Sequence, residues 1–191
     1  IATALTAAGR DFAILILADP ANAEIPDHYK RNIIPIGFPD DAALQMAMAS
    51  ADLGLSVSLW EGFNLPLAEM QWLGKPVLCF DVGAHPEVVA HPWFLCRDQN
   101  QMIEKASRIL AGTGLDKSEH EQALHDFKAT FTWSKTVDRL ETQLEKLTQP
   151  GLPEIVVDIS NAAIDTGNSG VIRVTRSLCR ELQKYCDPVF V

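Results

Sequence analysis

Two glutamates separated by seven residues, Glu61 and Glu69, lie in the run SLWEGFNLPLAE of residues 58–69. An ionised carboxylate only accepts hydrogen bonds, which suits the paired hydroxyls of a ribose or hexose better than a phosphate. The spacing alone is equally compatible with Glu61 as a solvated loop acid and Glu69 as an acid favoured by the helix dipole. The pair is therefore a candidate sugar-binding site whose interpretation depends on its surroundings.

The segment between the two glutamates has the chemistry of a phosphate-binding turn. An apolar run precedes it, Gly62 can bring the backbone close to a ligand, and Pro66 favours the start of a helix. Backbone amides at a helix N-terminus, at the carboxyl end of a parallel strand, are a common site for a diphosphate. We therefore expect the amides of residues 62–67 to receive phosphate oxygens.

Apolar runs that alternate with helix-period segments predict the elements that hold this turn. The expected strands cover residues 12–18, 32–36, 53–59, 76–80 and 93–96, and the expected helices cover 42–51, 66–73, 86–89, a segment that starts at Asp98, 118–130 and 134–147. Strands that are apolar on both faces and alternate with helices indicate a Rossmann-like, doubly wound parallel sheet in an α/β fold. Residues 1–6 resemble the interior of a helix, so the chain is expected to begin within a longer protein.

The pattern restarts after residue 147. Residues 148–153 are Pro- and Gly-containing linker, residues 155–159 a strand, 165–170 a Gly-containing loop, 171–185 a helix, and 188–191 the start of another strand. We expect a first domain over residues 1–147, a linker over 148–153, and a short β-α-β segment over 154–191 that opens a second Rossmann-like domain. Taken alone, Gly167 and Gly170 are typical of ordinary loop glycines, and a role in a second site is the alternative.

Composition excludes several classes of function. The net charge of −9 argues against binding of DNA or RNA, and no apolar run approaches the length of a membrane-spanning helix. The four cysteines lack a Cys-x-x-Cys pair and are expected to be reduced in a cytoplasmic protein. His120 and His125 lack nearby thiol partners, so we expect no zinc site. His85 can face the turn, or serve as a cap or a surface residue.

The run EGFNLPLAEMQWLGKPVL over residues 61–78 resembles the motif of the retaining glycosyltransferases of the GT-B group often called family 4. The resemblance extends over about residues 10–147, including residues 32–52, the loop of residues 81–88, and FTWS at residues 131–134. It implies that residues 1–147 form the C-terminal, donor-binding half of a GT-B enzyme. The tail more weakly resembles the start of an N-terminal half, which implies tandem modules.

The resemblance also implies a role for each matching position. Glu61 would be the catalytic residue, contacting the donor sugar near the reacting carbon and steadying an oxocarbenium-like transition state, and Glu69 would hold the ribose hydroxyls. The backbone of the segment between them would bind the diphosphate and donor sugar through Gly62, Phe63, Asn64, Leu65 and Pro66. Asn64 stands where the family commonly has glycine. Whether Glu61 is ever a nucleophile is left open by the residues.

The resemblance predicts transfer of a hexosyl group, with retention, from a nucleoside-diphosphate sugar to a glycan or lipid-linked acceptor in polysaccharide biosynthesis. No metal or other cofactor is expected. The family's upstream basic pair and its acceptor-binding N-terminal domain have no counterpart here, so we expect the isolated chain to show little or no transfer. The alternatives are a non-catalytic nucleotide-sugar-binding or scaffolding domain, and a GT-B epimerase or phosphorylase. Peripheral association of the parent protein with the inner face of a membrane is left open, as are the base, sugar, acceptor, linkage and oligomeric state.

Overall fold

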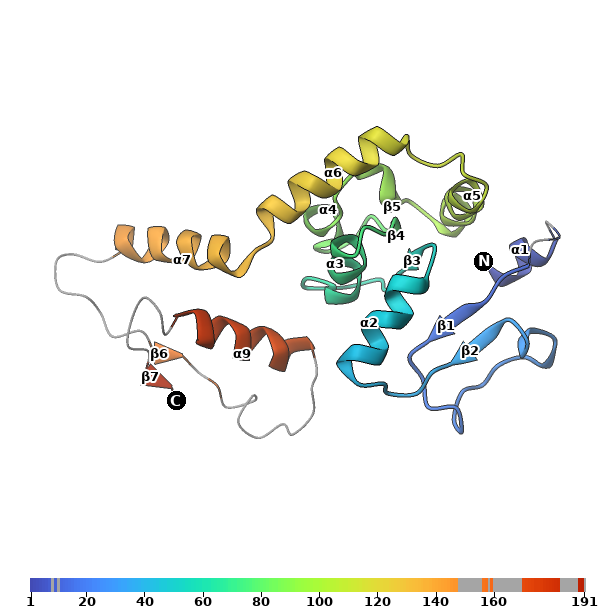
Figure 1. The fold of residues 1–191 in the computed structure, drawn as a ribbon, viewed down its shortest axis with the longest axis horizontal. Helices are drawn as coiled ribbons and strands as arrows, with labels where there is room; N and C mark the ends of the chain where they lie inside the picture. Colours follow the sequence, from blue (N-terminus) through green and yellow to red (C-terminus); the bar gives the residue numbers. More distant parts are fainter. Residues whose placement is uncertain are drawn as a thin grey trace. The chain divides into compact units, whose positions relative to one another are not determined.

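The computed structural model describes residues 1–7, 9, 11–147, 156–157, 159, 170–182 and 189–190. The chain forms two compact units, residues 1–127 and residues 128–191 (Figure 1). Each unit contains parallel strands and helices.

Five short strands form two parallel sheets in the first unit. Strand β1 (Ile14–Ile16) pairs with β2 (Ile33–Pro35), and β4 (Val77–Phe80) lies between β3 (Gly54–Leu55) and β5 (Leu95–Cys96). All three pairings are parallel, with Gly54 opposite Val77 and Cys79 opposite Leu95 in the central sheet. The predicted α/β class with parallel strands is confirmed.

The helices follow the strands in the predicted alternation. They are α1 (Ala2–Ala7), the 3-10 helix η1 (Asp27–Tyr29), α2 (Asp41–Ser50), α3 (Leu65–Trp72), α4 (His85–Val88), the 3-10 helix η2 (Pro92–Phe94), α5 (Gln99–Leu110) and α6 (Lys117–Thr130), whose last turn belongs to the second unit. Asp40 and Asp98 cap α2 and α5, because each carboxylate accepts a hydrogen bond from the backbone amide three residues later.

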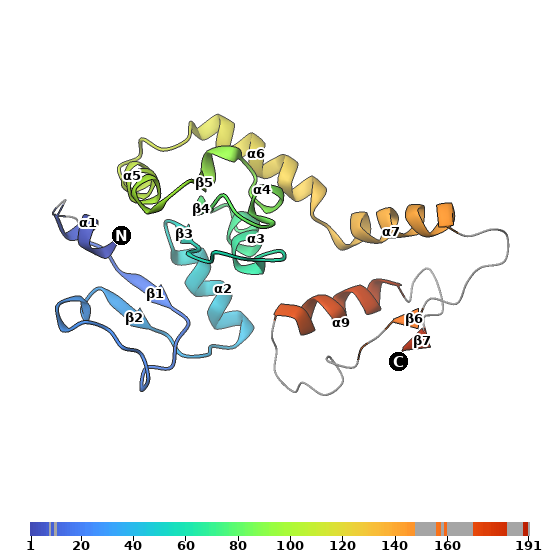
Figure 2. The same ribbon diagram turned by 180° about the vertical axis from the view of Figure 1, so that it is seen from behind.

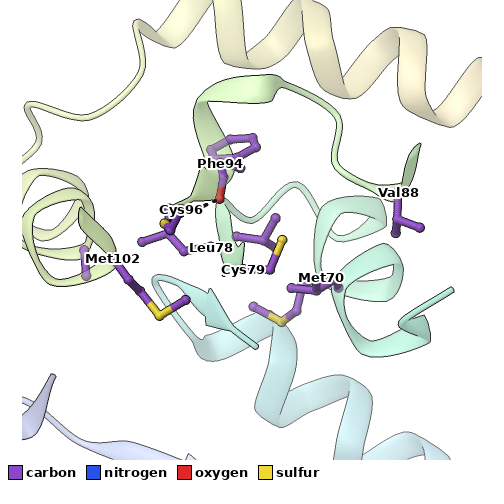
Figure 3. Close-up of a cluster of buried hydrophobic side chains, with 10 residues drawn as sticks. Met70, Leu78, Cys79, Val88, Phe94, Cys96 and Met102 are labelled. Carbon is purple, nitrogen blue, oxygen red and sulfur yellow. Dashed lines mark hydrogen bonds between the residues drawn. The ribbon is translucent and has the colours of Figure 1, made fainter. Parts of the chain in front are cut away.

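The core of the first unit surrounds β4. In both views α3 and α4 lie on one side of the β3–β4–β5 sheet and α5 lies on the other (Figures 1 and 2). Met70 of α3 and Met102 of α5 face β4 from these two sides, with Leu78 and Cys79 between them (Figure 3). Burial on both faces explains why β4 is a continuous apolar run.

The two sheets of the first unit are separate. Strand β1 pairs only with β2, and β3 pairs only with β4, among the described strands. Residues of β1, β3, α2 and α5 line a cavity of about 1620 Å³. The expected doubly wound sheet is therefore not continuous between β1 and β3.

The second unit repeats the strand–helix–strand order. Strand β6 (Val156–Val157) pairs in parallel with β7 (Val189–Phe190), and α9 (Gly170–Leu182) lies between them in sequence. Helix α7 (Trp133–Leu147) packs against α9. The predicted β-α-β segment is thus present, whereas the expected linker at 148–153 and most of the Gly-containing loop at 165–170, including Gly167, lie outside the described residues. The domain boundaries at 147 and 154 stay predictions.

None of the described helices combines the length and apolarity needed to cross a membrane.

Candidate functional site

The candidate site is the loop of residues 56–64, which joins β3 to α3. The sequence predicts a strand over residues 53–59, but β3 ends at Leu55, and this prediction is wrong at its carboxyl end. Ser56 makes the last ladder bond, from its amide to the carbonyl of Leu78 at 2.9 Å. The Ser58 amide then turns to the Ser56 hydroxyl, at 3.4 Å, so the chain leaves the sheet.

The loop exposes apolar side chains that a buried strand would have covered. Val57, Leu59 and Trp60 are all mostly exposed, Trp60 to 81%. Glu61 follows them and is half-buried. Glu69 is half-buried as well and lies one turn into α3, where it has interactions of its own. The two acids thus bracket the loop end and the first turn of α3, as their spacing predicts.

Asn64 controls the entry into α3. It is the only non-glycine residue with positive φ in the described part of the chain, at φ 60° and ψ 69°. Its Oδ1 atom accepts a hydrogen bond from the Leu67 amide at 3.4 Å, which makes it the N-cap. Helix α3 begins at Leu65, with Pro66 in its first turn. The predicted helix start at Pro66 is off by one residue.

The amides near this cap divide into engaged and available groups. Leu67 donates to Asn64, and Pro66 has no amide hydrogen. Of the amides expected to receive phosphate, that of Leu67 is therefore already engaged. No hydrogen bond within the described residues engages the amides of Gly62, Asn64 and Leu65. A Cβ on Gly62 would meet no atom within 4 Å, so the space beside it is open.

Helix dipole and amides are the local sources of positive potential in this loop. The sequence contains no Lys or Arg from residue 32 to residue 74. Within this segment, the groups that can hold an anion are the backbone amides at the N-terminus of α3.

The loop after β4 contacts the backbone of Glu61 and supports it. The Ala84 amide donates to the Glu61 carbonyl at 3.2 Å. Gly83, at φ 55°, lies so close that a Cβ there would sit 2.9 Å from the Glu61 carbonyl oxygen and 3.3 Å from its amide nitrogen. Gly83 therefore permits a direct backbone contact that no other residue allows.

Sequence reasoning missed the supporting residues Ser56 and Gly83, and it left the role of His85 open. His85 is completely buried, so it is not a surface residue. Its Nδ1 atom lies 2.8 Å from the Phe80 carbonyl oxygen, and its Nε2 atom lies 2.9 Å from Asn64 Nδ2. A histidine two residues after a glycine in the loop that follows β4 was the available signal, but its partner lies 21 positions earlier in the chain.

The described residues contain no group of three or more His, Cys, Asp or Glu side chains placed to hold a metal ion. Metal independence stays a prediction.

Comparison with known proteins identifies the family of this chain. A family model described as "Glycosyl transferases group 1" matches residues 3–112, more than half of the chain. Trehalose synthase of Pyrococcus horikoshii is 31% identical over 110 residues, covering 56% of this chain and 26% of that protein. N-acetyl-alpha-D-glucosaminyl L-malate synthase of Bacillus anthracis is 30% identical over 119 residues, covering 60% of this chain and 31% of that protein.

A solved structure has the same fold. Sucrose-phosphate synthase from Thermosynechococcus elongatus matches 76% of this chain and 42% of its own, with a TM-score of 0.55 and 20% identity. The chain spans less than half of the length of each of these three proteins.

Proposed function

The chain belongs to the group 1 glycosyltransferases, and from that premise we propose that it is the donor-binding part of a retaining hexosyltransferase. The donor is a nucleoside-diphosphate sugar, and the acceptor is a glycan or a lipid-linked glycan in polysaccharide biosynthesis. Another part of a longer protein supplies the acceptor site. The isolated chain binds the donor but performs little or no transfer.

One observation carries the proposal. The unengaged amides of Gly62, Asn64 and Leu65 lie at the N-terminus of α3, immediately beyond the carboxyl end of β3, with one glutamate before them and one after. Ligands of open α/β sheets bind at this end of the strands. Amides suit a diphosphate, and carboxylates suit sugar hydroxyls.

In the proposed complex, each of these residues binds a different part of the donor. The backbone of Gly62, Phe63, Asn64 and Leu65 holds the diphosphate, and Pro66 sets the direction of the first turn of α3. Glu69 accepts hydrogen bonds from the ribose hydroxyls. Glu61 contacts the sugar near its reacting carbon, where a carboxylate stabilises positive charge that develops in the transition state.

Calorimetric titration of the chain with UDP, GDP, ADP and dTDP, and with their common sugar conjugates, tests donor binding. One nucleotide series should bind, and Glu69→Gln should weaken it about tenfold, because the loss of a charge-assisted hydrogen bond costs on the order of 1.5 kcal/mol. Glu104→Gln, an exposed glutamate on α5, is the matched control and should bind as the parent chain does.

A binding series that does not respond to Glu69→Gln would refute the ribose role. Failure of the chain to bind any nucleotide, repeated on a longer protein with the upstream segment, would refute the donor-binding proposal and favour a non-catalytic scaffold. Multiple turnovers by the isolated chain on a labelled nucleotide sugar would contradict its proposed dependence on a separate acceptor-binding part.

A further inference from the structure

A continuous network of hydrogen bonds connects the candidate-site loop of residues 56–64 to the core. It runs from the Phe80 carbonyl, at the end of β4, through His85 and Asn64 to Ser56, at the end of β3. His85 is completely buried, and Asn64 is 7% exposed. Polar side chains buried this deeply must satisfy their hydrogen bonds within the protein.

Two backbone groups, the Phe80 carbonyl and the Leu67 amide, determine the direction of the hydrogen bonds in this network. The Phe80 carbonyl can only accept, so Nδ1 of His85 carries the hydrogen. In the neutral ring Nε2 is then an acceptor, and Asn64 must present its amide nitrogen to it, at 2.9 Å. That orientation places Oδ1 of Asn64 toward the Leu67 amide, which can only donate.

The second Nδ2 hydrogen of Asn64 completes the arrangement by bonding to the Ser56 hydroxyl oxygen at 2.9 Å. Three elements, β3, α3 and α4, thus converge on one side chain. A residue such as alanine at position 64 would be strained by about 1–2 kcal/mol in this left-handed backbone, and it would lack these hydrogen bonds. The network offsets that strain and holds the loop in one conformation.

This conformation is the one that presents the amides of Gly62, Asn64 and Leu65. Because the segment of residues 32–74 supplies no Lys or Arg to attract phosphate, the affinity of the loop depends on how well its amides are oriented before the ligand arrives. Preorganised donors avoid the entropic cost of ordering the loop on binding.

We infer that His85 and Ser56 are positioning residues, which act through the Asn64 side chain to hold the 61–65 backbone in the conformation that receives the donor diphosphate. The inference rests on the proposed function for the identity of the ligand. The network itself is open to test in the unliganded chain.

The first measurement is ¹⁵N NMR of the His85 ring and amide hydrogen exchange of residues 61–65 in the unliganded chain. We expect a neutral ring protonated at Nδ1. His85→Leu removes the acceptor, Asn64→Gly removes the side chain but tolerates positive φ, and each should speed exchange in the loop about tenfold. His125→Leu, the same change at an exposed site on α6, should leave the loop unaffected. A ring protonated at Nε2, or unchanged loop exchange in both variants, would overturn the inference.

The second measurement is the binding of UDP, GDP, ADP and dTDP to the parent chain, to the three single variants and to the double variant Asn64→Gly/His85→Leu. Asn64→Gly and His85→Leu should each weaken binding about tenfold, and the double variant should bind no more weakly than Asn64→Gly alone, because both residues act through one bond. Additive losses would indicate separate structural roles and would refute the inference. If neither the parent chain nor a longer protein binds a nucleotide, the proposed function fails. Hydrogen exchange of the loop amides still tests whether the network holds the loop in one conformation.

Discussion

Replacement of Gly83 by alanine should disturb the candidate site through a backbone contact rather than through any side chain. A Cβ at this position would lie 2.9 Å from the Glu61 carbonyl oxygen, and the residue has φ 55°. The left-handed backbone costs an L-residue about 1–2 kcal/mol, and forcing apart packed atoms costs about 1–3 kcal/mol more. We therefore expect Gly83→Ala to lower the stability of the first unit by about 3 kcal/mol.

Gly74→Ala is the matched control, because Gly74 has φ 83° but open space where a Cβ would be. It should cost only the 1–2 kcal/mol of backbone strain. Native-state hydrogen exchange of the β4 amides reports on the first unit alone, so it is the appropriate measurement.

The difference between the two variants isolates the contact with Glu61. Nucleotide affinity should separate them as well, since Gly83→Ala displaces the Glu61 backbone and the Ala84 hydrogen bond, whereas Gly74 lies at the far end of α3. Equal losses of stability in the two variants would show that the Glu61 loop yields without cost, and the reasoning about its support would be wrong.

Other parts of the first unit give three further predictions. Gln71→Leu should destabilise it by about 2–4 kcal/mol in denaturant unfolding, because the buried amide of Gln71 bonds backbone groups of the 88–90 turn that would lose their partner; an unchanged midpoint would contradict this. Burial raises the pKa of the Cys79 thiol to about 12, and Cys96 and Asp81 add to the effect. At pH 8 a thiol reagent should therefore modify Cys79 at least a hundredfold more slowly in the folded chain than in the urea-unfolded chain. Similar rates in the two states would refute this prediction. Burial also lowers the pKa of His120, with Glu121 opposing and His91 adding; the unfolded state then binds more protons as pH falls below about 6.5, so stability should fall from pH 7.5 toward pH 5, and His120→Phe should flatten that slope.

Local sequence chemistry predicts the helix starts well. Asp40 and Asp98 each precede an apolar-periodic segment and each accepts the capping hydrogen bond, although the sequence alone leaves Asp41 as an alternative to Asp40. Those bonds span three residues, so the information that specifies them is present in the sequence. The order of parallel strands and helices follows from apolar periodicity in the same way.

The carboxyl end of β3 shows why the site could be predicted only in outline. Residues 53–59 read as a strand because Val57 and Leu59 continue the apolar alternation. The strand nevertheless stops at Leu55. The Ser56 amide makes the last ladder bond, and the Ser56 hydroxyl accepts hydrogen bonds from Ser58 and Asn64. A serine that accepts a hydrogen bond from a residue eight positions later has no signal in a periodicity pattern.

Long-range support is the part that the sequence does not reveal. The bond between Asn64 and His85 joins residues 21 positions apart, and it exists only because the loops after β3 and β4 emerge at the same edge of the sheet. Gly83 also depends on a distant contact. A glycine is needed there because the Glu61 backbone lies too close for a Cβ, and not only because of the local turn. Neither requirement can be derived before the strand pairing is known.

The choice of asparagine at position 64 is therefore a joint property of two loops. Asparagine tolerates positive φ better than most residues, yet its buried Nδ2 group needs two acceptors. Ser56 supplies one and His85 supplies the other, while the Phe80 carbonyl holds His85 in the required tautomer. Glycine at position 64 would reach the same backbone without any of these partners, so it leaves the residue at position 85 unconstrained. Because the asparagine depends on these specific contacts, residues 64 and 85 form one structural unit in this chain, and a change at either one weakens the hydrogen bonds that hold the backbone of both loops in place.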